Sequence, residues 1–361
     1  MRLRLFCSLV LLVSLTACAA APAVDAVYSP AFFYLASPQA AEPALVLQDA
    51  PNAAPRQRIP LNPPADCSFY ALRPAPLGRW IAVEWECAFG PAVELFDTAS
   101  GESHFPLSDP TIDSRFLAWQ PDGHALYLKI GTLSVPQTLR VEAATGKATE
   151  LPISPFAYDL ASMPDGNRIY YALTKGIGFG SEAWVAGPEG QNPSQLLVDE
   201  KNIIALAHYS PDGKQIAFIK FPDDQNVTPS GELWVMDSAG FHARKLADAD
   251  AGRGFAPSWS PDGSKLAFIG RDQPAQPEAL NLSVYDLSRS ALLTFSAVSS
   301  TQPVWSPDGS QVAFSTSGAA TSLLTPPVPV PGDTMELWFY EISSGKGTKL
   351  LTGACCAGWI R

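Results

Sequence analysis

The chain has 361 residues, of which 47% are hydrophobic and 16% are charged, and it contains 18 Phe, 10 Tyr and 9 Trp. This composition supplies ample apolar material for a packed core and excludes an intrinsically disordered chain. The formal net charge of -11 argues against a protein that holds nucleic acid through phosphate contacts.

The N-terminus has the pattern of an export signal. Two arginines precede an apolar stretch, Leu5 to Leu15, that is too short to span a bilayer as a stable helix. The stretch ends in Leu-Thr-Ala-Cys at positions 15–18, which resembles the bacterial lipobox, where the chain is cut before the Cys and the Cys thiol is lipidated. We therefore expect residues 1–17 to be a lipoprotein signal peptide and Cys18 to carry the lipid.

This signal predicts where the protein resides and one of its partners. Residues 18–27 would form the lipidated Cys and a short linker. The lipid would anchor the protein to a membrane of the cell envelope, with the folded part facing the periplasm or the exterior. An ordinary secretory signal with an incidental Cys is the alternative, and under either interpretation the chain leaves the cytoplasm.

An internal repeat covers the remaining residues. Each copy has an apolar run, a tight turn that is usually Pro-Asp-Gly, and a second apolar run, although the first copy has lost its Asp-Gly. The turn prolines recur every 43 to 50 residues, at Pro30, Pro76, Pro121, Pro164, Pro211, Pro261 and Pro307. A period of this length is the signature of a repeat architecture.

Each repeat predicts four short antiparallel strands, which we name A to D in chain order. In the turn between strands A and B, Pro sets φ, Asp bonds its own backbone and Gly adopts positive φ. Strand C is expected at segments such as 232–237 and 336–341, and strand D at segments such as 243–247 and 347–352. Four such strands in each repeat are typical of a β-propeller blade.

Both ends of the chain fit the same repeat. The last residues match a strand A, with Trp359 aligned to Trp259 and Trp305. Strands B, C and D of that blade are expected at residues 31–37, 44–49 and 56–60. We therefore predict an all-β protein with a single domain over residues 28–361. This domain would be a propeller of seven four-stranded blades closed by pairing of the N- and C-terminal strands, with six blades as the alternative.

The repeats carry a family resemblance. The Trp-Ser-Pro-Asp-Gly segments at 259–268 and 305–314 resemble the propeller of TolB and related periplasmic proteins, and more broadly the WD-repeat-like propellers with an SPDG repeat. The likeness covers nearly all of residues 28–361 and implies the propeller fold. It implies little about activity, because the same repeat occurs in peptidase propellers. A lipid anchor is expected here in place of the additional N-terminal α/β domain of TolB.

The sequence offers no catalytic signature. It has no Gly-x-Ser-x-Gly elbow, which argues against a serine peptidase. A metal-dependent hydrolase would need carboxylates and His at one height around the channel. Asp66, Asp113 and Asp159 precede their turn prolines by 10, 8 and 5 residues, and His208 stands alone among the inner strands. We expect no catalytic residue, no metal and no cofactor, with a hydrolase or lyase that uses the central channel as the alternative.

Binding is the function that the pattern favours. The B to C and D to A connections vary in length and emerge on the face opposite the short A to B turns, where recognition usually occurs. The longest connection, Ser317 to Met335, contains prolines that favour an extended conformation, and a passive exposed loop is its alternative. Around the channel mouth, the residues expected to bind are Arg115, Tyr158, Arg253 and Phe255.

These expectations together describe a membrane-anchored, non-catalytic scaffold outside the cytoplasm. Its partner would be a protein, a peptide or an envelope polymer, and the acidic balance of the chain excludes nucleic acid.

The cysteines beyond the signal predict one disulfide. Cys67 and Cys87 lie on either side of the Leu77-Gly78 turn and fall nearly opposite each other on its hairpin, so we expect them to be bridged in an exported protein. Cys355 and Cys356 either form a vicinal bridge or stay unpaired. No Cys-x-x-Cys pair or His cluster accompanies them, which argues against zinc.

Overall fold

A computed structural model describes ten segments of the chain: residues 31–37, 43–107, 112–131, 135–174, 176–224, 230–251, 255–271, 281–299, 301–316 and 335–360. Within these segments the secondary structure consists of strands, and no helix long and apolar enough to cross a membrane is found there. The predicted signal peptide, Cys18 and the linker lie outside the described residues.

The strands are short and follow one another closely along the chain. In chain order they are β1 (Ala31–Ala36), β2 (Ala44–Gln48), β3 (Pro55–Pro60), β4 (Cys67–Pro74), β5 (Trp80–Cys87), β6 (Gly90–Asp97), β7 (Ser103–His104), β8 (Ser114–Trp119), β9 (Ala125–Ile130), β10 (Gln137–Glu142), β11 (Ala148–Glu150), β12 (Ala157–Ser162), β13 (Ile169–Thr174), β14 (Ser181–Ala186), β15 (Ser194–Asp199), β16 (Asn202–Tyr209), β17 (Gln215–Pro222), β18 (Ser230–Asp237), β19 (Arg244–Asp250), β20 (Ser258–Trp259), β21 (Lys265–Gly270), β22 (Asn281–Asp286), β23 (Ala291–Val298), β24 (Val304–Trp305), β25 (Gln311–Thr316), β26 (Glu336–Glu341), β27 (Lys346–Thr352) and β28 (Ala354–Ile360).

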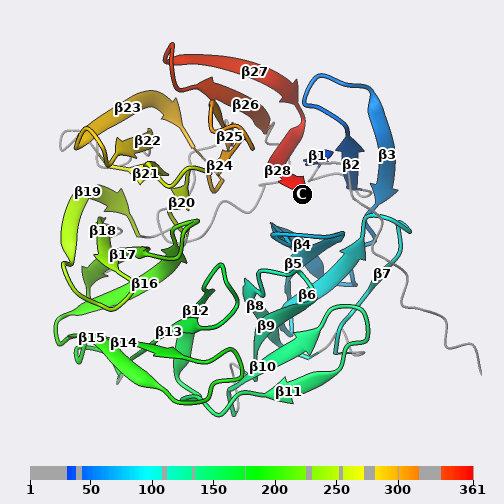
Figure 1. Ribbon diagram of the computed structural model, residues 1–361. Coiled ribbons are helices and arrows are strands. Elements are labelled where there is room, and N and C mark those ends of the chain that lie inside the picture. The colour runs from blue at the N-terminus through cyan, green and yellow to red at the C-terminus, as the bar shows by residue number, and fades with distance from the viewer. Residues whose placement is uncertain are drawn as a thin grey trace, which may run out of the picture.

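Neighbouring strands pair antiparallel into small sheets. Four sheets, β4–β7, β8–β11, β12–β15 and β24–β27, each contain four consecutive strands. Strands β16 to β23 form an eight-stranded sheet, in which β19 and β21 share a single residue pair, Ala249 with Gly270. Figure 1 shows these sheets arranged in a ring, with the first strand of each repeat innermost. The predicted four-strand repeat therefore corresponds to how the strands pair.

The two ends of the described chain meet in one sheet. Its strand order is β28-β1-β2-β3, and Ala31 lies opposite Ile360 and Phe32 opposite Trp359. The rings of Phe32 and Trp359 lie 5.3 Å apart. Around the ring, contacts between sheets continue from β24 to β28, from β28 to β4 and from β6 to β8.

The Pro-Asp-Gly turns have the geometry that the sequence predicts. Their glycines adopt φ between 70° and 73°, at Gly123, Gly166, Gly213, Gly263 and Gly309. In the three Ser-Pro-Asp-Gly turns the Asp carboxylate accepts a hydrogen bond of 2.6 to 2.7 Å from the Ser hydroxyl. Each Asp also accepts the backbone N–H two residues later, at 3.0 to 3.1 Å. These bonds confirm that the turn aspartates form the turns.

The core lies between adjacent sheets. One cluster of buried side chains combines Ile219 and Val235 of one repeat with Trp259, Leu266 and Phe268 of the next. Three tryptophans at the ends of inner strands also donate their indole N–H to a backbone carbonyl of the preceding inner strand. These pairs are Trp119 with Arg73 at 2.8 Å, Trp259 with His208 at 3.0 Å, and Trp305 with Ser258 at 2.9 Å. Each buried indole is thereby satisfied while it joins two sheets.

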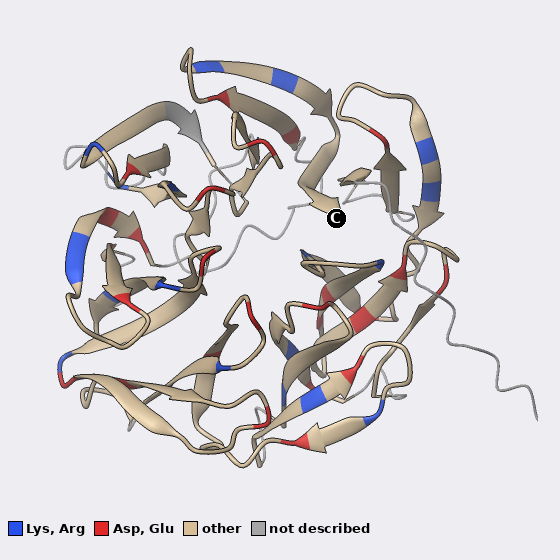
Figure 2. Ribbon diagram, viewed as in Figure 1, with Lys and Arg blue, Asp and Glu red and all other residues tan. Residues whose placement is uncertain are grey.

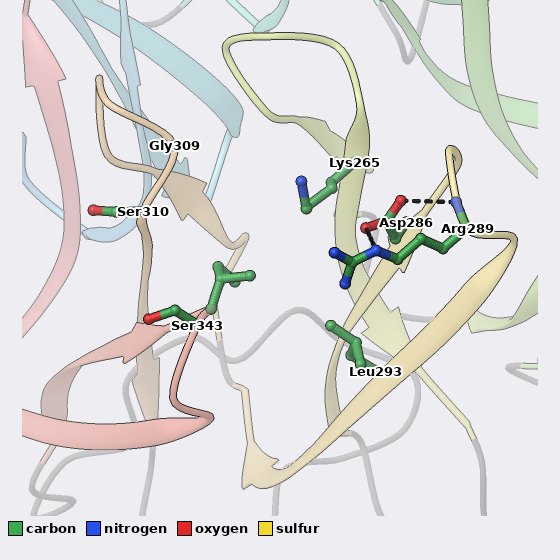
Figure 3. A pocket seen from close by; sticks show the side chains of 8 residues that line it. Lys265, Asp286, Arg289, Leu293, Gly309, Ser310 and Ser343 are labelled. Carbon is green, nitrogen blue, oxygen red and sulfur yellow. Dashed lines mark hydrogen bonds and ion pairs between the residues drawn. The ribbon is translucent and has the colours of Figure 1, made fainter.

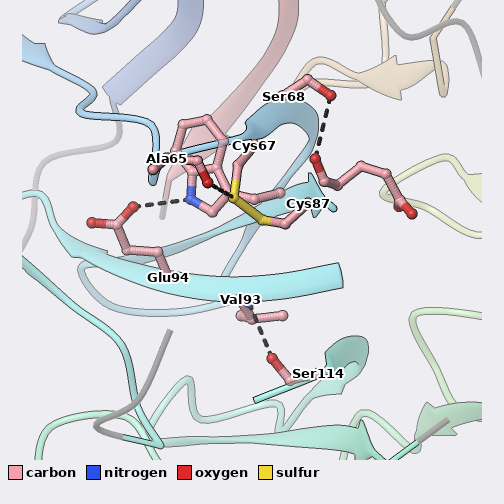
Figure 4. The surroundings of a disulfide bond; sticks show 9 residues. Ala65, Cys67, Ser68, Cys87, Val93, Glu94 and Ser114 are labelled. Atoms are coloured by element: carbon pink, nitrogen blue, oxygen red, sulfur yellow. Dashed lines mark hydrogen bonds between the residues drawn. A yellow bond between two sulfur atoms is a disulfide. The ribbon is translucent and has the colours of Figure 1, made fainter. Parts of the chain in front are cut away.

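A disulfide joins the first two strands of the β4–β7 sheet. Cys67 and Cys87 occupy directly opposite positions on β4 and β5, and their sulfurs are 2.00 Å apart. Figure 4 shows the bond at the end of the hairpin, with the Cys67 Sγ also near the Ala65 carbonyl. Cys355 and Cys356 are unbridged, and Cys355 is buried.

Candidate functional site

The two ends of the sheets carry different kinds of connection. The A to B and C to D turns lie at one end, which we call the turn face; it includes residues 121–123 and 261–263. The B to C and D to A connections lie at the other end, which we call the loop face; it includes residues 151–156 and 176–180. A four-stranded antiparallel order requires this separation.

Large apolar side chains are exposed on the loop face of two neighbouring sheets. The exposed fractions are 75% for Val135, 64% for Phe156, 73% for Ile177 and 67% for Phe179. Val135 and Phe156 belong to the connections of sheet β8–β11, and the other two belong to the hairpin between β13 and β14. Inner strands β8 and β12 of these sheets contact each other. We call these four residues the apolar loop cluster.

The backbone around Phe156 is held by a buried lysine. Lys129, at the end of β9, donates its ammonium protons to the carbonyl oxygens of Pro155 and Ala157, the latter at 2.7 Å. Burial lowers the pKa of Lys129. Because the carbonyls on both sides of Phe156 are fixed, the exposed ring is presented by an ordered segment.

The hairpin that carries Ile177 and Phe179 is held by a carboxylate from the next repeat. The N–H groups of Gly178 and Gly180 both donate to Oδ2 of Asp223 at 2.8 Å. Asp223 directly follows β17, and its own N–H donates to the Lys201 carbonyl at 2.9 Å. Loops that are ordered before binding lose less conformational entropy when a partner docks.

The predicted binding residues occupy different environments. Arg115 lies in strand β8, not in a loop, and its guanidinium is exposed and 3.9 Å from a carboxylate oxygen of Glu86. Tyr158 also lies in a strand, β12, and its hydroxyl donates to the Ile204 carbonyl at 2.7 Å. Phe255 is half-buried ahead of β20. Arg253 lies outside the described residues.

The two strand positions differ from the expected loops for a physical reason. Cross-strand pairing begins earlier than the turn-based alignment implies, with Ser114 opposite Ile130 and Ala157 opposite Leu173. Burial raises the pKa of the Tyr158 phenol, and its hydrogen bond ties β12 to β16. Tyr158 therefore joins two sheets, whereas Arg115 keeps an exposed cationic group. Of the predicted connection Ser317 to Met335, residues 317–334 lie outside the described residues.

The acidic candidates and His208 form no shared centre. The Asp159 carboxylate accepts the N–H of Ala207 at 2.9 Å and so links β12 to β16. Burial raises the pKa of Asp159 to about 6. Within the described ranges, no three His, Cys, Asp or Glu side chains lie together in a way that could hold a metal ion.

The apolar loop cluster was not predicted from the sequence. A weak signal exists in the Gly-Ile-Gly-Phe-Gly segment at 176–180, where large apolar residues alternate with glycines. Alternation of this kind also occurs in half-buried strands, so exposure follows only once the hairpin is placed beyond β13.

Comparison with known proteins identifies relatives of part of the chain. Residues 182–322 match the family model of the TolB beta propeller domain. Over 128 residues the chain is 31% identical to the Tol-Pal system protein TolB of Azoarcus sp. (strain BH72). That alignment covers 35% of this chain and 28% of the Azoarcus protein, so the chain spans less than a third of this relative's length.

Solved structures extend the likeness to most of the chain. TolB from Acinetobacter baumannii has a TM-score of 0.51 at 17% identity, over 88% of this chain and 79% of that one. An oligogalacturonate lyase in complex with manganese has a TM-score of 0.56 at 14% identity, over 76% of this chain and 79% of that one. At these identities the structural likeness concerns the fold alone. In sequence and in fold, the chain is thus similar to TolB-like β-propellers.

Proposed function

We propose that the protein is a non-catalytic binding scaffold of the cell envelope that recognises a protein or peptide through its loop face. Its body would be a propeller of seven blades closed through β28 and β1. The single pair between β19 and β21 supports counting the eight-stranded sheet as two blades. The pairing of β1 with β28 and the contacts of β28 with β4 and β24 support closure.

The apolar loop cluster carries the binding proposal. Large exposed apolar side chains on the same face of neighbouring sheets are candidates for an interaction site. Phe156, Ile177 and Phe179 are all more than 60% exposed on segments fixed by Lys129 and Asp223. Aromatic and aliphatic anchors on ordered loops are typical of protein-recognition surfaces. The Asp159 carboxylate joins two sheets, and so it does not favour the alternative of a hydrolase or lyase.

An envelope location agrees with the N-terminal pattern and with the relative's name. The Azoarcus relative is described as a Tol-Pal system protein, which favours a protein partner in the envelope for this chain as well. Lipidation at Cys18 would hold the scaffold at a membrane surface. Cells fed a labelled fatty acid should label the wild type and leave Cys18→Ala unlabelled; equal label on both proteins would refute lipidation at this residue.

Capture with matched surface variants tests the binding surface. The variant Phe156→Ser/Ile177→Ser/Phe179→Ser removes three exposed anchors while leaving the buried contacts intact. The control is Phe241→Ser, because Phe241 is 66% exposed on the turn face. Purified proteins are incubated with solubilised envelope, and captured proteins are quantified by mass spectrometry.

We expect the triple variant to lose at least nine-tenths of a partner that the wild type and the Phe241→Ser protein both retain. A partner set that is identical for all three proteins would contradict recognition through the apolar loop cluster. Unchanged thermal unfolding of the triple variant serves as the check that the fold is preserved.

A further inference from the structure

A second candidate site lies on the turn face, at the opposite end of the strands from the apolar loop cluster. There, a hollow of about 460 Å³ opens between strands β21–β23 and the turns of sheet β24–β27. Its polar lining includes Lys265, Asp286, Arg289, Ser310 and Ser343. Figure 3 shows the Lys265 and Arg289 side chains directed toward the space that Ser310 and Ser343 border from the other side.

Both cations of this hollow keep donors for a ligand. The Lys265 ammonium donates to the hydroxyl of the adjacent Ser264 at 3.0 Å, and within the described residues it forms no ion pair closer than 4 Å. The Arg289 side chain is 81% exposed, and its Nε is 3.9 Å from Oδ2 of Asp286. At this separation the Arg289 guanidinium makes no full hydrogen bond to the carboxylate.

Asp286, the one acid among the residues that line the hollow, accepts several hydrogen bonds within its own turn. Oδ1 of Asp286 accepts the N–H of Ser288 at 3.0 Å, the Ser288 hydroxyl at 2.6 Å and the N–H of Arg289 at 3.1 Å. These bonds hold the pKa of Asp286 below its usual range. Lys265 and Arg289 are thus the two cations that line the hollow, and Asp286 is the one acid among its lining residues.

The position of Lys265 on its strand distinguishes this repeat from four others. Lys265 lies directly opposite Asp286 on the neighbouring strand. In four other repeats the residue opposite the corresponding acid is uncharged: Trp80 opposite Asp97, Ala125 opposite Glu142, Gln215 opposite Asp237, and Gln311 opposite Glu341. The repeat itself therefore does not require a lysine at this position.

The charge and the walls of the hollow select a class of ligand. Two neighbouring cations can hold one carboxylate, whereas a doubly charged phosphate would place more negative charge beside Asp286. Leu293, which is 37% exposed, and Ile342 provide apolar contact next to the cations. A carboxylate next to apolar groups is the chemistry of an acidic side chain in an otherwise apolar peptide.

The strand at the rim of the hollow favours an extended peptide. Leu293 belongs to β23, the last strand of its sheet, whose sequence Ala-Leu-Leu-Thr-Phe-Ser-Ala-Val has neither charge nor proline. The outer strands β3, β19 and β27 each contain Arg or Lys, as Figure 2 shows. Charges and prolines on outer strands discourage the addition of another strand.

We propose that this hollow binds the carboxylate of an acidic residue in an extended, apolar peptide segment of a partner protein. Lys265 and Arg289 would hold the carboxylate, and the segment would lie along the start of β23 beside Leu293. This site differs from the loop-face surface, so the two can succeed or fail independently.

Fluorescence anisotropy with two matched peptides tests the proposal. The probe is a fluorescein-labelled Thr-Val-Thr-Glu-Val-Thr-Val peptide, and its partner has Gln in place of Glu. Both are titrated with the full-length protein in mild detergent. The variants are Lys265→Gln and Arg289→Gln, and the control is Lys214→Gln, which removes the same charge from an 81% exposed turn-face lysine paired with Asp212.

We expect the Glu peptide to bind at least tenfold more tightly than the Gln peptide. Lys265→Gln and Arg289→Gln should each weaken binding at least fivefold, and Lys214→Gln should weaken it less than twofold. Four outcomes would overturn the proposal: no saturable binding, equal affinity of the two peptides, equal effects of all three substitutions, or displacement by inorganic phosphate at lower concentration than by acetate. Lys265→Gln and Arg289→Gln probe the hollow separately. If one of them misfolds, the other still decides the test.

Discussion

At the scale of single residues, the pKa values of two aspartate carboxyls are shifted in opposite directions by their surroundings. Burial raises the pKa of Asp159 to about 6, even though the N–H of Ala207 donates to its carboxylate. The hydroxyl of Ser260 and the N–H of Ser264 lower the pKa of Asp262, which sits in an exposed turn, to about 2. Desolvation dominates at the first site and hydrogen bonding at the second.

Asp159 should make stability depend on pH in the direction unusual for an acid. The pKa of the Asp159 carboxyl is 3.8 in the unfolded chain and about 6 in the folded protein. The folded state therefore binds the proton more tightly. The stabilisation is complete below about pH 4 and is lost as pH rises through 6. We expect the free energy of unfolding, measured with urea from pH 4 to 7, to fall more steeply for the wild type than for Asp159→Asn.

Asp224→Asn removes a carboxyl at an exposed position and is the charge-matched control for this comparison. Parallel profiles for the wild type and Asp159→Asn would show that Asp159 titrates alike in the folded and unfolded states. That result would contradict the burial of its carboxylate between β12 and β16.

At the scale of elements, turns join neighbouring repeats as well as strands within a repeat. Gly123 and Gly166 occupy the same turn position with φ of 71° and 73°. A Cβ on Gly123 would lie 1.9 Å from the carbonyl oxygen of Leu77 in the preceding repeat, whereas a Cβ on Gly166 would meet no atom within 4 Å. The two sites therefore share a left-handed backbone conformation and differ in their contact with a neighbour.

Alanine substitution at these two turns should separate the cost of a left-handed backbone from the cost of a clash with the neighbouring repeat. Gly166→Ala should lower the free energy of unfolding by about 1 kcal/mol, the cost of a left-handed backbone for a non-glycine residue. Gly123→Ala should cost at least about 1 kcal/mol more, because the turn must also move away from Leu77. Urea unfolding of both variants checks the difference, and equal costs would argue against close packing of these two turns.

The β4–β5 hairpin offers a chemical test of strand register. With Cys67 directly opposite Cys87, peptide mapping without reductant should recover one linked peptide containing both. Cys355 and Cys356 should be alkylated after denaturation without reduction. Because the bridge closes a segment with a sequence separation of 20, its removal in Cys67→Ala/Cys87→Ala should cost about 3 kcal/mol. Recovery of both as free thiols would refute the register.

At the scale of the whole molecule, the repeat was predictable and the surfaces were not. Turn spacing placed the strands because Pro, Asp and Gly fix local backbone geometry, and the alignment of Trp359 with Trp259 and Trp305 anticipated the pairing of β28 with β1. The apolar loop cluster and the cationic hollow each combine residues from different repeats. These two surfaces form only when neighbouring sheets pack together. A local sequence pattern does not predict that packing. Tyr158 shows the same limit, because its partner carbonyl belongs to the next sheet.

Closure of the ring is the claim on which the scaffold rests, and hydrogen exchange of the backbone amides measures it directly. If the ring closes through the termini, the amides of β1 and β28 that bond each other should exchange as slowly as those of β17, an interior strand, because opening either would require loss of the shared sheet. Fast exchange in both β1 and β28 alongside slow exchange in β17 would contradict a closed ring.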